Sequence, residues 1–269
     1  MTTPLPLAVT IGDPAGVGPE IVAHILAREA ELGLPPLRVV GEPGPSVRPG
    51  QPDRASAQCA LDGLGQAVAM VRSGECSALV TGPVAKSAIA LIDPNFIGQT
   101  EFLADACGLP REDAVMMLAG PSLKTVPMTV HCALADVPAR LSQHLIVQRS
   151  RIVAAALRRD YGIDAPRIAI AGLNPHAGED GTMGREEIEV IAPAIATLRE
   201  EGIDATGPHP ADTLFAPHKR GTYDVAIAMY HDQALVPIKA LDFDEGVNVT
   251  LGLPIVRTSP DHGTAFDIA

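Results

Sequence analysis

The stretch LAVTIGDPAGVGPE at residues 7–20 begins with a short apolar run and continues into a turn containing three glycines. The run at residues 7–11 is typical of a buried strand, and residues 20–31 have helical periodicity. Glycines permit a tight turn and close backbone approach, and Pro19 suits the first turn of a helix. The stretch predicts a strand, a turn and a helix whose start can hold an anion. A strand-to-helix turn needs glycine in any case, and the pattern matches neither a Walker loop nor the Rossmann glycine spacing.

The same order of a short aliphatic run and a helical pattern recurs along the chain. Further strands are predicted at residues 78–80, 125–130, 168–171 and 225–229, and further helices at 61–72, 142–161 and 185–201. The Pro- and Gly-rich segment 41–53 is predicted to be a surface loop. Alternation of this kind predicts an α/β fold with a mostly parallel sheet and helices on both faces.

The composition narrows the class of protein. Of the 269 residues, 46% are hydrophobic but only 3% aromatic, so the core must be built from Ala, Val, Ile and Leu. A net charge of −12 argues against a general nucleic-acid or anionic-membrane binder. No apolar run reaches the roughly 20 residues that cross a bilayer, and no signal-peptide pattern is present. The four cysteines lack paired spacing, which indicates reduced thiols. We expect a cytoplasmic protein.

Three predicted strands are followed by a histidine. His131 closes one strand, His176 follows the next through a short loop, and His231 follows the third. A single histidine in such a place is more often a hydrogen-bonding group than a ligand. Three at the same end of one sheet can converge, and imidazole nitrogens favour Zn²⁺ and related ions. A metal site and three separate structural histidines both remain open at this point.

Candidate anion-binding residues lie late in the chain. Lys239, Asn248 and Arg257 fall in a glycine-rich stretch downstream of His231. Lysine, arginine and amide side chains are suitable partners for a phosphate. Each of them taken singly could equally be an ordinary solvated group.

Together these motifs resemble the 4-hydroxythreonine-4-phosphate dehydrogenase family of vitamin B6 biosynthesis. Besides the stretch at 12–20, the matching segments are TGPVAK (81–86), GQTEFL (98–103), GLNPHAGE (172–179), PADTLF (210–215), MYHDQ (229–233), GVNVTLGLP (246–254), RTS (257–259) and DHGTA (261–265). They occur in one order and cover nearly the whole chain.

The resemblance implies a fold similar to isopropylmalate and isocitrate dehydrogenases, with two α/β subdomains flanking an active-site cleft. We expect the first subdomain at residues 1–98 plus 258–269, and the second, with the metal, substrate and dimerisation surfaces, at 99–257. The family forms homodimers with shared active sites.

The resemblance also suggests roles for individual residues. His131, His176 and His231 correspond to the metal ligands, which come from both subunits, and Zn, Mg and Co all remain candidates. Substrate-binding positions are Gln99, Thr100, Lys239, Asn248 and Arg257. Lys239, Asp232 and Asp212 are the candidate catalytic residues, with Lys239 either transferring a proton or only binding phosphate. Gly12, Asp13, Asp261, His262 and Gly263 are the candidate NAD-binding residues.

The implied activity is NAD-dependent oxidation of 4-phosphooxy-L-threonine, followed by decarboxylation to 3-amino-2-oxopropyl phosphate. Three features depart from the family pattern: Gln99 replaces a histidine, segment 41–53 is short, and the sequence ends at Ala269, before a glycine-rich turn and last helix typical of the family. Because Gln99 is expected beside the substrate, a sister dehydrogenase for D-erythronate or D-threonate 4-phosphate remains an alternative. An aromatic cis-diol acid is a more remote one, and a non-catalytic phospho-metabolite-binding protein is the alternative outside the enzymes.

Overall fold

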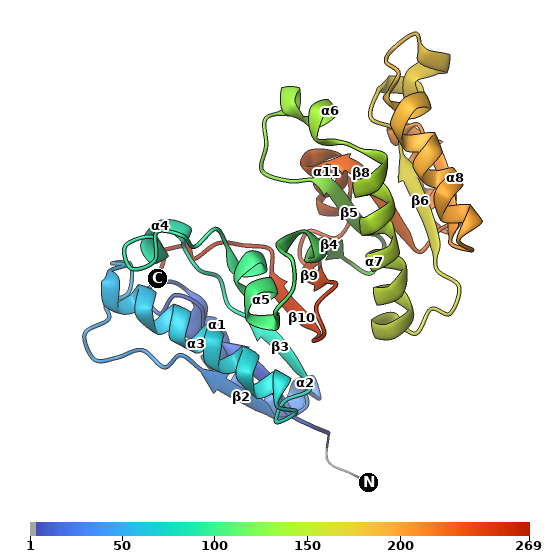
Figure 1. Cartoon of the computed structure of the whole chain (residues 1–269). Coiled ribbons are helices and arrows are strands. Elements are labelled where there is room, and N and C mark those ends of the chain that lie inside the picture. Colours follow the sequence, from blue (N-terminus) through green and yellow to red (C-terminus); the bar gives the residue numbers. More distant parts are fainter. Residues whose placement is uncertain (1–3) are drawn as a thin grey trace. The chain divides into compact units, whose positions relative to one another are not determined.

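Two α/β units make up the chain in the computed structural model, which describes residues 4–269 (Figure 1). One unit contains the chain up to Ala114 together with Leu253–Ala269, and the other is Val115–Gly252. Residues 1–3 of the first expected subdomain lie outside the described residues. The α/β class predicted from the sequence is confirmed.

The first unit has a parallel sheet with the strand order β2-β1-β3-β10. Its strands are β1 (Leu7–Thr10), β2 (Leu37–Val40), β3 (Ala78–Thr81) and β10 (Arg257–Pro260). Its helices are α1 (Gly18–Ala27), α2 (Glu29–Leu32), α3 (Arg54–Arg72), α4 (Lys86–Ile89) and α5 (Gln99–Cys107), with a 3₁₀ turn at Arg111–Asp113.

The second unit has the strand order β9-β4-β5-β8-β6-β7, in which only β4 runs antiparallel to its neighbours. Its strands are β4 (Val115–Ala119), β5 (Lys124–Thr129), β6 (Arg167–Ala171), β7 (Asp204–His209), β8 (Val225–Tyr230) and β9 (Val247–Leu251). Its α-helices are α6 (Val137–Arg140), α7 (Gln143–Tyr161), α8 (Ala192–Glu200), α9 (Ala211–Leu214), α10 (Pro217–Arg220) and α11 (His231–Leu241). Shorter helical turns lie at Leu134–Asp136 and Pro175–Gly181, and a π-helical turn at Glu187–Ile191 precedes α8.

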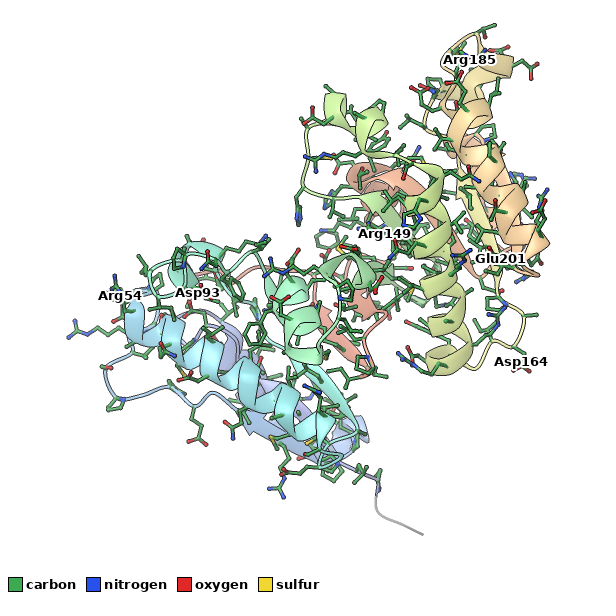
Figure 2. The ribbon with its side chains drawn as sticks, in the orientation of Figure 1. Arg54, Asp93, Arg149, Asp164, Arg185 and Glu201 are labelled. Atoms are coloured by element: carbon green, nitrogen blue, oxygen red, sulfur yellow. The ribbon has the colours of Figure 1, made fainter. Side chains whose placement is uncertain are left out.

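Each unit has its own aliphatic core. In the second unit, Ile146 and Leu157 of α7 pack with Ile170 of β6 and Leu198 of α8. The two helices are also joined at the surface, where Arg151 of α7 donates to the carboxylate of Glu201 just beyond α8. Glu201 is labelled in Figure 2. An exposed ion pair of this kind contributes little stability, so the buried aliphatic contacts hold the helices on the sheet.

The five strands expected from the sequence all form, within one residue of the expected ends. The helix predicted at 61–72 begins earlier, at Arg54, because Asp53 caps it: its Oδ1 accepts from Ser56 N at 2.8 Å, and Ser56 Oγ accepts from Asp53 N at 3.1 Å. The helix predicted at 20–31 is interrupted at Arg28, whose backbone is not helical. The helix predicted at 185–201 begins as the π-helical turn.

The boundaries between the units differ from those expected. Helix α5 packs into the first unit, where Leu103 and Ala104 share a core cluster with Leu64 and Leu79. Residues 99–114 and 253–257 therefore belong with the first unit, because the apolar face of α5 is buried there.

The turn after β1 is fixed by close backbone contacts. Gly12 has φ +74°, and a Cβ on it would lie 2.2 Å from Pro83 O, so only glycine fits. Asp13 N donates to Pro83 O at 2.9 Å, and Asp13 Oδ1 accepts from Ala15 N at 3.0 Å. Val17 N donates to Thr264 O at 3.0 Å. The turns that follow β1 and β3 are thereby joined to the C-terminal segment.

Among residues 4–269, no helix is both long and apolar enough to cross a bilayer.

Two glycines of α3 allow a matched test of this packing. A Cβ at Gly63 would lie 3.0 Å from Gly41 Cα, whereas a Cβ at Gly65 would meet nothing within 4 Å. We expect Gly65→Ala to raise the free energy of unfolding by about 0.5–1 kcal/mol, since alanine favours the helix. Gly63→Ala should lower it, because overpacking against backbone costs about 1–3 kcal/mol. Denaturant unfolding of both variants checks this; a shift in the same direction for both would contradict the packing.

Candidate functional site

Two of the candidate metal ligands lie together at the carboxyl ends of β5 and β8. His131 follows β5, and His231 is the first residue of α11 directly after β8. Because these strands are parallel neighbours, their ends meet at the same edge, and the two imidazole rings lie 5.7 Å apart between centroids. His131 has φ +48°, an uncommon backbone conformation for a non-glycine residue that is often found at functional sites.

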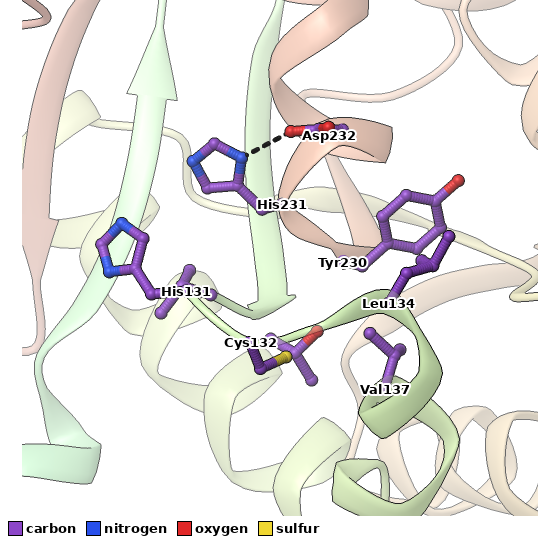
Figure 3. A pocket seen from close by; sticks show the side chains of 9 residues that line it. His131, Cys132, Leu134, Val137, Tyr230, His231 and Asp232 are labelled. Carbon is purple, nitrogen blue, oxygen red and sulfur yellow. Dashed lines mark hydrogen bonds and ion pairs between the residues drawn. The ribbon is translucent and has the colours of Figure 1, made fainter.

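The two histidines line a pocket of about 270 Å³ together with Asp232, Tyr230 and Leu134 (Figure 3). His231 Nδ1 lies 2.8 Å from Asp232 Oδ1. A carboxylate at this distance favours the tautomer with a proton on Nδ1 and leaves Nε2 with its lone pair, as in metal sites where a second group orients a histidine ligand. Asp232 is therefore placed to orient His231.

His176 is not among the residues that line this pocket. It lies in the turn Pro175–Gly181 after β6, where residues 176–180 all have positive φ. A run of left-handed conformations in mostly non-glycine residues is costly and persists only where the surroundings enforce it.

A buried carboxylate holds the start of this turn. Glu187, only 3% exposed, accepts from Leu173 N at 2.7 Å and Asn174 N at 2.8 Å through Oε1. Its Oε2 accepts from Asn174 Nδ2 at 3.0 Å. These three hydrogen bonds fix the backbone that leads into His176.

Gln233 joins the segment that precedes this turn to the end of β8. Its Oε1 accepts from Met229 N at 2.7 Å, and its Nε2 donates to Gly172 O at 2.8 Å. Glu187 and Gln233 thus set the geometry of the loops that carry His176 and His231. Sequence reasoning assigned neither a role. Gln233 lies in the MYHDQ motif, but Glu187 lies outside the motifs and gives no signal of its own.

A basic pocket of about 190 Å³ lies in the first unit. It brings together four of the candidate residues, Gln99, Arg257, His262 and Gly263. It also contains Lys86, one of the four lysines in the chain, at the end of the TGPVAK motif. The sequence analysis matched the motif without assigning Lys86 to the site.

Arg257 is the buried centre of this pocket and is 3% exposed. Its Nη2 donates to Thr81 Oγ1 at 2.7 Å and to Gln99 Oε1 at 2.5 Å, and Gln99 Nε2 donates to Gly82 O at 2.9 Å. Burial lowers the pKa of the Arg257 guanidinium to about 10, so it stays charged at neutral pH. Gln99 therefore positions Arg257 by accepting from it, which an amide oxygen does without titrating.

The other candidate residues lie in different settings. Thr100 is the second residue of α5, next to Gln99. Lys239 lies in the last turn of α11, and Asn248 lies in β9 with its Oδ1 buried and without a hydrogen-bond partner among residues 4–269. Asp212, in the short helix α9, is exposed and lines neither pocket.

Of the residues expected to bind the nicotinamide cofactor, only His262 and Gly263 line the basic pocket. Gly12 and Asp13 shape the turn after β1, where Asp13 is 1% exposed and burial raises the pKa of its carboxyl group. Asp261 is exposed in the segment after β10.

The described donor groups of one chain fall short of what a metal requires. Within residues 4–269 of one chain, no three His, Cys, Asp or Glu side chains are grouped so as to hold an ion. The pair His131 and His231 offers two imidazoles of the type preferred by Zn²⁺ or Co²⁺, and a stable site needs at least one more ligand.

Comparisons with known proteins agree with these motifs. The family model described as "Pyridoxal phosphate biosynthetic protein PdxA" matches residues 23–269. The 4-hydroxythreonine-4-phosphate dehydrogenase of Erythrobacter litoralis (strain HTCC2594) is 54% identical over 303 aligned residues, covering 98% of this chain and 90% of that protein. The crystal structure of 4-hydroxythreonine-4-phosphate dehydrogenase from Klebsiella pneumoniae has a TM-score of 0.87 and 36% identity, covering 100% of this chain and 92% of that one.

A terephthalate 1,2-cis-dihydrodiol dehydrogenase from Burkholderia xenovorans LB400 is a more distant neighbour. Its TM-score is 0.70 at 29% identity, with 98% of this chain and 92% of that one covered. The family match extends over most of the chain and includes both pockets. This protein therefore belongs to the pyridoxal phosphate biosynthetic protein PdxA family.

Proposed function

We propose that this protein is an NAD-dependent, divalent-metal-dependent 4-hydroxythreonine-4-phosphate dehydrogenase. It oxidises the secondary hydroxyl of 4-phosphooxy-L-threonine to a ketone, and the resulting β-keto acid loses CO₂ to give 3-amino-2-oxopropyl phosphate. The relatives named for this activity, such as the 54% identical protein of Erythrobacter litoralis, support the reaction. We place this step of pyridoxine 5′-phosphate biosynthesis in the cytoplasm.

The observation that carries the proposal is the buried, charged Arg257 in the basic pocket with Lys86 and Gln99. A dianionic phosphate is a suitable ligand for arginine and lysine side chains in a partly desolvated site. Arg257 and Lys86 bind the phosphate, and Thr100 at the start of α5 donates a further hydrogen bond. Binding the phosphate positions the distant hydroxyl for reaction.

Two further residues are assigned to the substrate on the family motifs. Asn248 and Lys239 are assigned to the substrate, with Lys239 either holding a proton for transfer or neutralising the phosphate. Asp232 keeps His231 oriented through the 2.8 Å contact. Asp212, which lines neither pocket, is assigned a catalytic role on the PADTLF motif alone.

The metal is assigned to His131 and His231 of one chain, with His176 supplied by a second copy. These histidines would hold a divalent cation that supplies Lewis acidity toward the substrate hydroxyl, and Gly12, Asp13, Asp261, His262 and Gly263 would hold the nicotinamide cofactor that supplies the hydride acceptor.

The division of ligands supports a homodimer with shared active sites. His176 lies on a separate turn and not in the histidine pocket, so a second chain can complete the ligand set. Leu134, which lines that pocket, is 65% exposed, as expected of an apolar residue that contacts a partner subunit.

Gln99 bears on which substrate is oxidised, because its side chain contacts Arg257 directly. NADH formation should be measured on metal-loaded protein with 4-phosphooxy-L-threonine, D-erythronate 4-phosphate and an aromatic cis-dihydrodiol acid, the last prompted by the Burkholderia neighbour. We expect the phosphothreonine to react fastest. Preference for erythronate 4-phosphate would favour the sister enzyme, and no reaction with any of the three would favour a binding protein.

The histidine pocket predicts metal stoichiometry. His131→Ala and His231→Ala should each lose most of the bound zinc or cobalt, since each removes an imidazole ligand. His218→Ala, on the exposed helix α10, is the matched control and should retain it. Metal content after loading and desalting is measured by mass spectrometry. Unchanged content in both pocket variants would exclude this site.

The basic pocket predicts how KM depends on charge. Arg257→Ala should raise KM for the phosphorylated substrate about tenfold or more, equivalent to about 1.4 kcal/mol, with some loss of kcat. Lys86→Ala should act in the same direction, and Gln99→His should be tolerated. Steady-state kinetics of the three variants provide the measurement. If Arg257→Ala left KM and kcat unchanged, a substrate without a phosphate group would replace 4-phosphooxy-L-threonine as the proposed substrate.

The bonds of Glu187 predict a role in positioning His176. Glu187→Gln has one acceptor oxygen instead of two, so it cannot satisfy all three donors and should weaken metal binding about 10–100-fold. Glu189→Gln, which loses only an exposed pair with Arg185, should bind metal normally. Competition with a chromogenic chelator gives the affinities. Wild-type affinity in a folded Glu187→Gln chain would assign that carboxylate a purely structural role.

A further inference from the structure

A second basic pocket lies in the second unit, at the end of the sheet where β5 and β8 begin. It has a volume of about 200 Å³ and is lined by Ser122 and Lys124 from the turn into β5, by Ile163, and by Arg220, Tyr223 and Asp224 ahead of β8. His131 and His231 follow the opposite ends of the same two strands. Since β5 has six residues, it spans about 20 Å, which separates this pocket from the histidine pocket.

Arg220 brings an unsatisfied donor to this pocket. Its Nε is buried and has no hydrogen-bond partner among the residues that the structure describes. A buried donor left without a partner costs about 1–3 kcal/mol, so such atoms usually mark a site for a ligand or water. The Tyr223 hydroxyl, which donates to Leu214 O at 3.0 Å, is not a partner of Arg220 Nε either. Burial raises the pKa of Tyr223 to about 12, so the hydroxyl carries no negative charge there.

Lys124 supplies the second positive charge. Its Nζ lies 5.4 Å from the ring centroid of Tyr161, an arrangement that attracts the ammonium group and restricts its position. The chain has only four lysines and a net charge of −12. Two cations on one small pocket are therefore a local reversal of the overall charge, and such a pocket attracts anions.

The nearby carboxylates are already engaged. Asp224 Oδ2 accepts from Arg167 N at 2.8 Å, and its Oδ1 accepts from Arg167 Nη2 at 2.9 Å. The Arg167 side chain lowers the pKa of Asp224, with a smaller contribution from Lys124, so the carboxylate is ionised and its charge is balanced by Arg167. Asp242 Oδ2 accepts from Ser122 N at 2.9 Å. Counting Lys124, Arg220 and Arg167 against Asp224 and Asp242, the charged groups leave an excess of one positive charge.

We propose that this pocket binds a phosphate group, either as inorganic phosphate or on a small ester, between the Lys124 ammonium and the Arg220 guanidinium. Its 200 Å³ lies below the roughly 300–1,000 Å³ of pockets for drug-sized ligands, so a nucleotide does not fit. A dianion matches two cations, and Arg220 Nε gains the acceptor that it lacks. The pocket shares no lining residue with the basic pocket of the first unit or with the histidine pocket.

The test uses the full chain with Arg257→Ala, so that phosphate binding at the proposed substrate site is weakened. Inorganic phosphate is titrated into this protein in Tris chloride and followed by isothermal titration calorimetry. We expect one remaining site per chain. Adding Lys124→Gln or Arg220→Gln should weaken it at least tenfold, whereas Lys219→Gln, an exposed lysine beside Arg220 that does not line the pocket, should leave it unchanged.

A charge-retaining variant, a folding control and a second ligand complete the test. Lys124→Arg keeps the charge and should retain binding, and the melting temperature without phosphate shows whether every variant is folded. Glycerol 3-phosphate in place of inorganic phosphate tests for an ester: tighter binding identifies an ester site and weaker binding a site for the free ion. The absence of a site in the Arg257→Ala chain, or a site insensitive to Lys124→Gln and Arg220→Gln, overturns the proposal. When Arg257→Ala is the only substitution, the loss of one phosphate site tests the proposed function and does not bear on the second basic pocket.

Discussion

Parallel pairing of neighbouring strands is the constraint on which both pockets of the candidate site depend. Parallel strands end at the same edge of a sheet, so the residues that follow them meet even when they are far apart in sequence. In the second unit this brings His131 and His231 to one pocket. The ends of the two strands are also joined directly, because the Thr129 hydroxyl donates to the carbonyl of Met229, 100 residues further along the chain. In the first unit β3 and β10 are parallel neighbours, and Arg257 of β10 donates to the hydroxyl of Thr81 at the end of β3.

Backbone conformations that are normally unfavourable occur at the candidate ligands. His131 has positive φ, and His176 lies in a run of five residues with positive φ. Such conformations need compensation. Glu187 accepts hydrogen bonds from the adjacent backbone N–H groups, and Gln233 donates to the carbonyl of Gly172. Buried polar groups therefore fix the loops that carry the histidines, at positions where apolar side chains would otherwise extend the core.

Charge is distributed against the overall composition. A chain with a net charge of −12 keeps Arg257 and Lys86 in one pocket and Lys124 and Arg220 in another. Concentrating few cations in small, partly buried pockets strengthens their attraction for anions, because the field is less screened there than at the open surface. Neutral partners serve the same end, since Thr81 and Gln99 orient Arg257 without cancelling its charge.

The sequence by itself determined the α/β class, the five strands with the clearest aliphatic runs, and the positions of the three histidines after strands, because these follow from local periodicity and turn residues. It could not find strands such as β2 and β9, which are partly exposed, nor the start of α3, which depends on the cap at Asp53. Only the tertiary structure decided that His131 and His231 share a pocket while His176 does not, that Lys86 joins Arg257, and that Glu187 orders the turn before His176. Those relations are set by which strands are neighbours and which side chains are buried between them, and a linear pattern of residues does not carry that information.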